Sequence, residues 1–168
     1  MNLGDIFINT GGIMIFYKRF ALSIILFTVL VNFTNSQPLT GTYNVGSGQT
    51  FTTLTGTGAA GFFNAVNTRG LSGNVTVRIT SNITETGAVA LQQWSGSNTI
   101  TITPSSASVK TLTGNVALPL IDLNGADRVT FDGRFSGAGR YLRFVNTNTG
   151  GQTFRFINDA TLNTITYC

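Results

Sequence analysis

Histidine is missing from this chain of 168 residues, and cysteine occurs only once, as Cys168. Without histidine, the chain cannot build a His-ligated zinc site, a Ser-His pair or a Cys-His pair. Because one thiol cannot close an internal disulfide, no disulfide framework holds the fold together. Charged residues are scarce as well, at 10% of the chain compared with about 25% in ordinary soluble domains. Any catalysis must therefore use other groups.

The residues that are abundant favour an all-β protein with many turns. The chain contains 20 glycines, is rich in Thr, Asn and Ser, and has 42% hydrophobic residues. Because Val, Ile, Leu and Phe recur along it, the composition is not that of a disordered chain. β-Branched and aromatic residues favour strands, and Gly and Asn favour the turns between them.

The N-terminal residues 1–36 have the pattern of a secretory signal peptide. Lys18 and Arg19 precede an uncharged apolar run at 20–31, and small or polar residues follow up to a cleavage site next to Gln37. The apolar run is shorter than the roughly 20 residues that a membrane span needs. We treat residues 1–13 as a spurious upstream extension. The prediction is a secreted or cell-surface protein with no transmembrane span after removal of the signal.

The net charge of +4 does not indicate a nucleic-acid partner. Lys18 and Arg19 leave with the signal, and the remaining arginines are scattered among aspartates without forming a basic run. Secretion would also separate the protein from most nucleic acid. We therefore expect no nucleic-acid binding.

Residues 37–105 are expected to form an N-terminal cap and the first strands. Apolar and polar residues alternate at 74–80 and at 98–103, which is typical of half-buried strands. An opening strand followed by a Gly-rich turn is predicted at 39–48, and a further strand and turn at 83–94.

One short helix is predicted at 57–70. Thr57 is a suitable N-cap, and Gly70 behind a basic residue is a suitable C-terminal stop. The apolar residues at helical spacing on one face are Ala59, Phe62, Phe63 and Val66.

Residues 106–168 contain a repeat. Short apolar runs alternate here with Asn, Asp and Gly, and the phrase LIDLNGADRVTFDG at 120–133 returns as FRFINDATLNTITY at 154–167, 34 residues later. A parallel coil places equivalent residues of successive turns above one another. The repeat therefore favours a coil of parallel strands over a sandwich.

Stacking in such a coil assigns structural roles to the repeated residues. Asn124 would lie at the same corner as Asn158, and stacked amides hydrogen-bond from turn to turn. Phe131 would lie over Ile165 in an apolar column. A third strand at 141–146 separates the two copies, which gives three strands per turn. Because the chain ends inside a strand-like run without a cap, we expect further coils downstream in a longer protein.

These phrases, together with FTTL and FFNAVNTRGLSGNVTVRI, resemble the N-terminal part of large secreted proteins of Bacteroidota. Those proteins belong to the right-handed parallel β-helix, or pectin-lyase-like, class, and the resemblance covers residues 40–168. It implies an all-β fold: a right-handed parallel β-helix, represented by its first coils, with an N-terminal capping region that contains one short α-helix. It also implies a downstream sorting domain of the type nine secretion system. Most members of the class have no assigned reaction.

The densest acidic group is Asp122, Asp127 and Asp132. Carboxylates in pectin-degrading β-helix enzymes hold Ca²⁺ or act as an acid and base pair, so these three are the candidate catalytic residues and Ca²⁺ is the only cofactor considered. The other interpretation is that they form turns and solvated strand ends, as the nearby Asn124-Gly125 and Asp132-Gly133 pairs suggest.

Three residues are candidates for contacting a glycan. Trp94 is the only tryptophan and lies among Gln and Ser, but the same composition suits a partly buried capping aromatic. Arg143 and Arg155 could pair with acidic sugars, because the guanidinium group matches a carboxylate.

The sequence leaves three functional hypotheses open. The first is a non-enzymatic secreted or surface β-helix with a structural, adhesive or glycan-binding role. The second is a polysaccharide lyase or glycoside hydrolase of the same fold, which requires converging carboxylates or arginines. The third is a freestanding carbohydrate-binding module, which predicts a closed sandwich.

Overall fold

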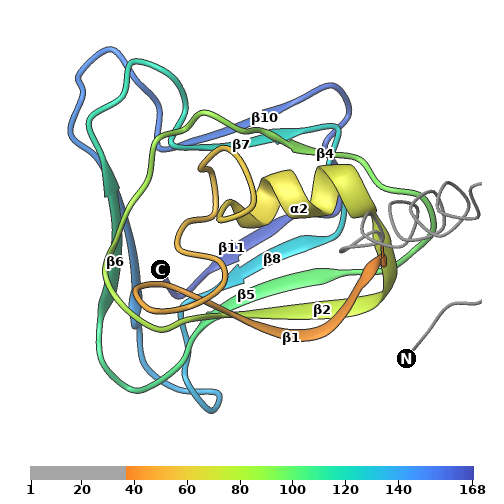
Figure 1. Ribbon diagram of the computed structural model, residues 1–168. Coiled ribbons are helices and arrows are strands. Elements are labelled where there is room, and N and C mark those ends of the chain that lie inside the picture. Colours follow the sequence, from red (N-terminus) through yellow and green to blue (C-terminus); the bar gives the residue numbers. More distant parts are fainter. Residues whose placement is uncertain (1–36) are drawn as a thin grey trace, which may run out of the picture. The chain divides into compact units, whose positions relative to one another are not determined.

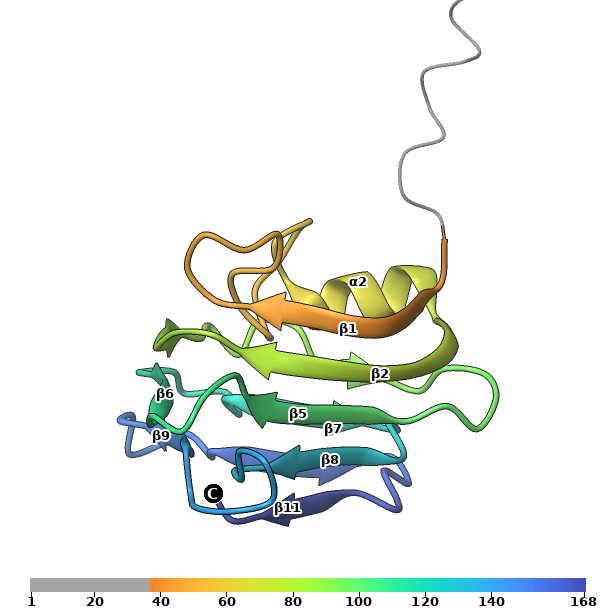
Figure 2. The same ribbon diagram turned by 90° about the horizontal axis from the view of Figure 1, so that it is seen from below.

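Short strands separated by corners wind into a parallel coil with three faces in the computed structural model, which describes residues 37–168 (Figures 1 and 2). The signal peptide predicted at 1–36, with the extension at 1–13, lies outside the described residues. Seen from the end that carries the helix, the chain runs clockwise through the three faces as it recedes. The predicted right-handed parallel β-helix is therefore confirmed.

Each face of the coil is one parallel sheet. The successive turns are β2–β3–β4, β5–β6–β7 and β8–β9–β10, with β1 before the first turn and β11 after the last. All of the pairs between the described strands are parallel. The closed sandwich that the hypothesis of a freestanding module predicts is therefore not formed, and that prediction is wrong. The first face consists of β1 (Leu39–Val45), β2 (Leu71–Ile79), β5 (Ile100–Pro104), β8 (Val129–Asp132) and β11 (Thr164–Thr166), the second of β3 (Ile83–Thr84), β6 (Lys110–Gly114) and β9 (Leu142–Asn146), and the third of β4 (Leu91–Gln92), β7 (Ile121–Asn124) and β10 (Phe154–Ile157).

The alternation of apolar and polar residues along the strands separates the core from the surface. Because side chains alternate between the two sides of a strand, equivalent residues in stacked strands form columns. The five-stranded face has one inward column and one outward column of five residues each. They are Tyr43, Val77, Ile102, Phe131 and Ile165 inside, and Thr42, Thr76, Thr101, Thr130 and Thr164 outside.

The repeat sets the pairing between the last two turns, with one shift. Thr164 pairs with Thr130 at the predicted spacing of 34 residues, whereas Phe154 pairs with Ile121 at a spacing of 33. The second copy therefore has one extra residue at the corner between these strands. Two residues of that corner, Asn158 and Asp159, have left-handed backbone conformations, with φ of 53° and 60°.

The predicted helix exists but begins later than expected. α2 spans Phe62–Arg69, so Thr57 does not cap it, and its N-cap is Gly61. The backbone at Gly58 has φ of +73°, a conformation that does not belong to a right-handed helix and delays the start. The predicted stop is correct, because Gly70 follows the last turn and its N–H bonds to the carbonyl of Val66. The helix lies across the N-terminal end of the coil (Figures 1 and 2).

Two parts of the first turns differ from the expectation. The strand and turn predicted at 83–94 are two short strands, β3 and β4, on different faces. β6 was not predicted, because KTLTG contains a single buried apolar residue, Leu112. β2 and β5, which lie within residues 37–105, pair in parallel as part of the coil.

Candidate functional site

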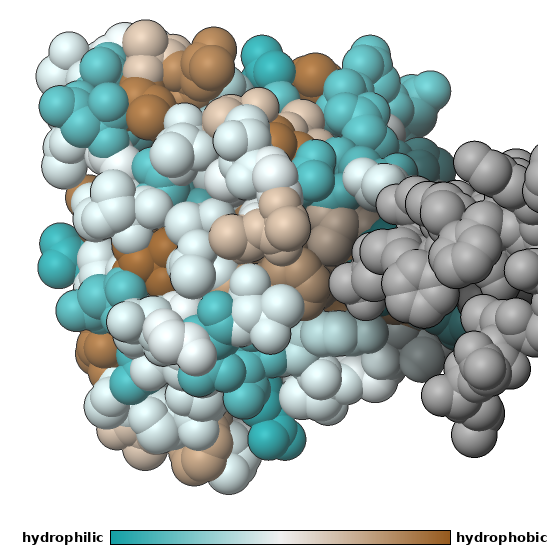
Figure 3. Space-filling model, viewed as in Figure 1, coloured by the Kyte–Doolittle hydropathy of each residue, from teal (hydrophilic) through white to brown (hydrophobic). Residues whose placement is uncertain are grey.

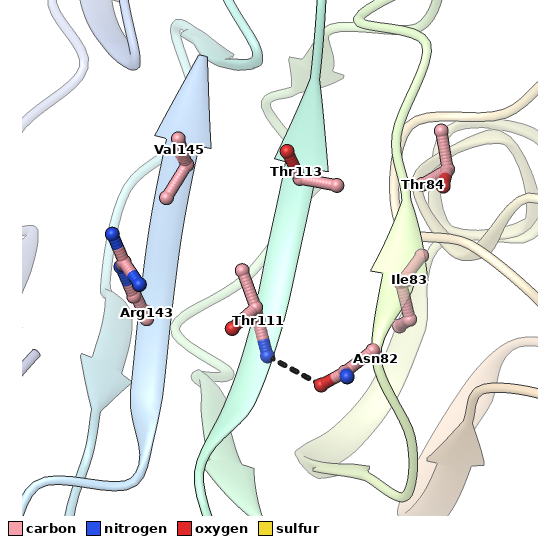
Figure 4. Close-up of a pocket in the computed structure, with 7 residues that line it drawn as sticks. All are labelled: Asn82, Ile83, Thr84, Thr111, Thr113, Arg143 and Val145. Carbon is pink, nitrogen blue, oxygen red and sulfur yellow. Dashed lines mark hydrogen bonds between the residues drawn. The ribbon is translucent and has the colours of Figure 1, made fainter. Parts of the chain in front are cut away.

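The outer surface of the β3–β6–β9 sheet carries a hollow of about 400 Å³ (Figure 4). Ile83, Leu112 and Phe144 occupy equivalent positions in the three strands and form the apolar inward column of this sheet. The neighbouring residues consequently face outward. They are Thr84 on β3, Thr111 and Thr113 on β6, and Arg143 and Val145 on β9, with Asn82 directly before β3, and they line the hollow together with Ile83.

Pairing between the strands sets the spacing of these groups. Thr113 lies beside Thr84 on one side and Val145 on the other, and Thr111 lies beside Arg143. Neighbouring strands are about 4.8 Å apart, so the side chains of Thr84 and Thr113 lie at roughly that interval. Asn82 closes one side, where its Oδ1 accepts a hydrogen bond of 2.9 Å from the N–H of Thr111.

Arg143 gives the hollow a positive charge. Its side chain is exposed, and it forms no ion pair with any residue of the described part of the chain. No carboxylate from residues 37–168 lines the hollow. A guanidinium group with five N–H donors can bind a carboxylate or a hydroxylated ligand, and the hydroxyl and amide groups around it can both donate and accept hydrogen bonds.

The candidate catalytic carboxylate Asp122 belongs to an ion pair between successive turns. Its Oδ1 and Oδ2 accept hydrogen bonds of 3.1 Å and 2.6 Å from Nε and Nη2 of Arg155, its partner on β10. The Asp122 side chain is 12% exposed and that of Arg155 is 40% exposed. The paired guanidinium group thus covers the carboxylate and leaves little of it for a substrate.

Asp127 and Asp132 have partners of their own. Asp127 accepts hydrogen bonds of 2.6 Å and 2.8 Å from the N–H and hydroxyl of Thr161, and the backbone bond is the main reason why its pKa lies below the ordinary value. Asp132 accepts three side-chain hydrogen bonds from Nε and Nη2 of Arg134, and these bonds are the main reason why its pKa lies below the ordinary value. Both carboxylates therefore remain ionised and occupied at neutral pH.

The three aspartates do not come together. Asp122 lies on β7, Asp127 at the corner after it, and Asp132 at the end of β8 on a different face (Figure 1). Within residues 37–168, no group of three acidic, Cys or His side chains is placed to hold a metal ion. Each of the three carboxylates has hydrogen-bond partners of its own, and none shares a partner with another.

Of the three candidate glycan contacts, only Arg143 lines the hollow. Arg155 lies on the β4–β7–β10 face, where it pairs with Asp122. Trp94 is 6% exposed, belongs to the core, and donates a hydrogen bond of 3.0 Å from its indole N–H to the carbonyl of Asn98. Its burial and its satisfied N–H agree with the capping interpretation.

The repeated asparagines form a structural contact away from the hollow. Asn158 donates a hydrogen bond of 2.5 Å from Nδ2 to Oδ1 of Asn124. A similar contact between turns joins Asp127 to Gln93, because the N–H of Asp127 donates a hydrogen bond to Oε1 of Gln93. Side chains at this corner thus satisfy polar groups that the bend would leave without partners.

Sequence reasoning missed one residue of structural importance, Glu85. Its side chain is 1% exposed, and its two oxygens accept hydrogen bonds from Leu54 N–H and from the N–H and hydroxyl of Thr55. Burial raises the pKa of Glu85 above its ordinary value of 4.5, although these hydrogen bonds act in the opposite direction. The one signal in the sequence is that Glu85 is the only glutamate of the chain.

Comparison with protein-family models, curated proteins and solved structures gives no match. Among the described residues, no helix is both long enough and apolar enough to cross a membrane.

Proposed function

We propose that this protein is secreted or displayed at the cell surface and binds glycans through the outer face of β3, β6 and β9, in an adhesive role without catalysis. It would belong to the pectin-lyase-like β-helix proteins of Bacteroidota that its phrases resemble. The signal-like pattern at 1–36 supports secretion, and the parallel coil supports the class at the level of the fold.

The observation that carries the proposal is the hollow around Arg143, which Thr, Asn, Ile and Val side chains line as well. It combines the guanidinium group of Arg143, which has no ion-pair partner among residues 37–168, with hydroxyl and amide groups on a parallel sheet, and no carboxylate of these residues lines it to oppose an acidic ligand. Sugars present hydroxyl groups that pair with such side chains, and uronic acids add a carboxylate that a guanidinium group can bind in a bidentate manner. The stacked strands hold these side chains at fixed intervals, so little ordering is needed on binding.

The absence of catalysis is supported by the positions of the aspartates. Acid–base cleavage of a glycosidic bond needs two carboxyl groups about 5–10 Å apart across one groove. Asp122 and Asp132 lie on separate faces, and each is bound to an arginine.

Calorimetric titration with oligogalacturonate and with a neutral oligosaccharide of equal length tests the proposal. We expect the acidic ligand to bind more tightly, and Arg143→Ala to weaken that binding by about tenfold or more, because charge-assisted hydrogen bonds contribute roughly 1.5–3 kcal/mol. Arg78→Ala is the matched control, since Arg78 is also exposed on the outside of a strand, but on β2.

Three results would count against the proposal. If neither ligand binds, or if Arg78→Ala weakens binding as much as Arg143→Ala, the hollow is not the binding site. If incubation with Ca²⁺ shortens polygalacturonate, as measured by size-exclusion chromatography, the protein is an enzyme.

A further inference from the structure

Thr55 and Glu85 form a buried polar contact between the cap, residues 46–70 with α2, and the first turn of the coil. Only three polar or charged residues are buried in the part of the chain that the structure describes, and these are two of them, the third being Asp122. The Thr55 hydroxyl lies 2.6 Å from one carboxylate oxygen of Glu85, and the backbone N–H groups of Leu54 and Thr55 donate to the two oxygens at 2.7 Å and 2.8 Å.

The same segment of the cap bonds to the chain that follows Glu85. The Thr55 carbonyl accepts a hydrogen bond of 3.0 Å from the N–H of Val89, and its hydroxyl oxygen accepts one of 3.0 Å from the N–H of Gly87. On the coil side, Glu85 itself is fixed, because its N–H donates to the carbonyl of Thr113 at 2.7 Å. Glu85 thus joins the cap to β6 through its side chain and its backbone.

The cap also covers a strand edge that would otherwise be open. Among the strands that the structure describes, β4 pairs only with β7, so no described strand lies along its other edge. Asn67 of α2 takes that place, since its Oδ1 accepts from the N–H of Gln92 and its Nδ2 donates to the carbonyl of Ala90. Open strand edges invite pairing with other chains, and an element that covers them prevents it.

The covering segment, residues 46–70, has few backbone contacts with the coil. Within it, backbone bonds join the loop to the helix, from Phe62 N–H to Thr53 and from Phe63 N–H to Leu54. It contains α2 and isolated bridges but no strand of its own. Apolar side chains of the segment, Phe51, Leu54, Phe62, Phe63 and Val66, belong to the core, and the surface seen from this end is largely polar or neutral, with scattered apolar groups (Figure 3).

We propose that residues 46–70 act as a lid that opens as one unit while the coil stays folded, and that Glu85 is the latch that holds it shut. Apolar packing alone tolerates small displacements, whereas a carboxylate that accepts three hydrogen bonds in a dry site fixes one position. Opening would expose the edge of β4 and the apolar underside of the lid. The inference does not depend on glycan binding.

Native-state hydrogen exchange of the full chain tests the lid. In the wild-type protein, the N–H groups of Leu54, Phe62, Phe63 and Val66 should exchange faster than those of Val77 and Ile102 in β2 and β5. Glu85→Gln replaces one acceptor oxygen by an amide that faces N–H donors. It should raise lid exchange by about tenfold or more, because an unsatisfied buried group costs roughly 1–3 kcal/mol. Exchange in β5 and β8 should change less than about twofold, in line with partial opening.

Matched variants identify the latch. Asp122→Asn converts the other buried carboxylate to an amide and should leave the lid unchanged. Thr55→Val should accelerate lid exchange and Thr55→Ser should not, because serine keeps the hydroxyl. Adding Thr55→Val to the Glu85→Gln variant should accelerate the exchange of the lid amides less than Thr55→Val does in the wild type, because both substitutions act on the same contact.

Any of three results would overturn the inference. If lid and coil amides of the wild-type protein exchange at one common rate, the lid is not a separate unit. If Glu85→Gln accelerates all amides equally, or Asp122→Asn opens the lid to the same extent, Glu85 is not its latch.

Discussion

Asn158 donates a hydrogen bond from Nδ2 to Oδ1 of Asn124, which lies 34 residues earlier in the chain. The strands on either side of this corner are paired in parallel, β10 with β7 and β11 with β8. The contact therefore connects the last two turns at the point where the chain passes from one face to the next.

Removing either asparagine should loosen this corner by a modest amount. We expect Asn158→Ala to lower the free energy of unfolding by about 1 kcal/mol, the usual net value of one hydrogen bond. Asn124→Ala should cost a similar amount, and the double variant should cost less than the sum, because both remove the same bond. Urea unfolding measures these differences, and strictly additive losses would show that the two side chains act independently.

Substitutions in the inward column of the five-stranded face should lower the free energy of unfolding more at buried positions than at exposed ones. Phe131 is fully buried and packs edge to face against Phe144 and Phe154, with ring centroids 5.6 Å and 5.2 Å away. Phe131→Ala should lower the free energy of unfolding by about 3–5 kcal/mol. Ile165, its neighbour in the column, is 41% exposed, so Ile165→Ala should cost clearly less. Equal losses in thermal or urea unfolding would contradict the assigned packing.

Glu85 should give the protein a pH-dependent stability. Its pKa is raised by burial, so the folded protein binds the proton more tightly than the unfolded chain, whose value is close to 4.5. The contribution of Glu85 to stability is thus greatest below pH 4.5 and decreases as the pH rises through the folded-state pKa. Urea unfolding from pH 4 to pH 8 should show the wild type losing stability relative to Glu85→Gln.

The comparison with Glu85→Gln removes the effects of other groups. Asp127 and Asp132 have lowered pKa values and stabilise the fold above their unfolded-state pKa values, but both are present in the two proteins. A wild-type protein that gains stability over Glu85→Gln with rising pH would contradict the sign given for Glu85.

Glycan binding should not depend on Ca²⁺. The hollow presents Arg143 and neutral polar groups and contains no carboxylate that could hold the ion. The affinity for oligogalacturonate should stay unchanged when EDTA replaces Ca²⁺, and it should fall as the salt concentration rises because the charges are exposed. Loss of binding in EDTA, measured by calorimetry at constant ionic strength, would point to a metal-dependent site instead.

The repeat made the coil predictable because stacking is a local rule. Placing Thr130 over Thr164 and Phe131 over Ile165 needs only a constant turn length, and the structure has these pairs. The extra residue at the second corner, where Asn158 and Asp159 adopt left-handed conformations, was not visible in the aligned phrases. For that reason β10 pairs with β7 at a spacing of 33 residues, whereas the aligned phrases predict 34.

The polar contacts were harder to predict, because they join distant parts of the chain. The pairing of Asp122 with Arg155 can be predicted only if the turn length on that face is known. No sequence pattern identifies Thr55 as the partner of Glu85. The hollow was equally hard to predict from the sequence. Thr111 and Thr113 lie on β6, which has too few apolar residues to be recognised as a strand. Arg143 was named for its residue type, and its position on the hollow follows from the pairing of β9 with β6.

Mapping a bound oligosaccharide by NMR tests the proposed function most directly. On titration with oligogalacturonate, the amide signals of Thr84, Thr111, Thr113 and Arg143 should shift together and saturate at one affinity. Those of Thr101 and Thr130, on the outer column of the five-stranded face, should stay in place and serve as the internal reference. Shifts confined to the five-stranded face, or no shifts at saturating ligand, would contradict the assignment of glycan binding to the β3–β6–β9 face.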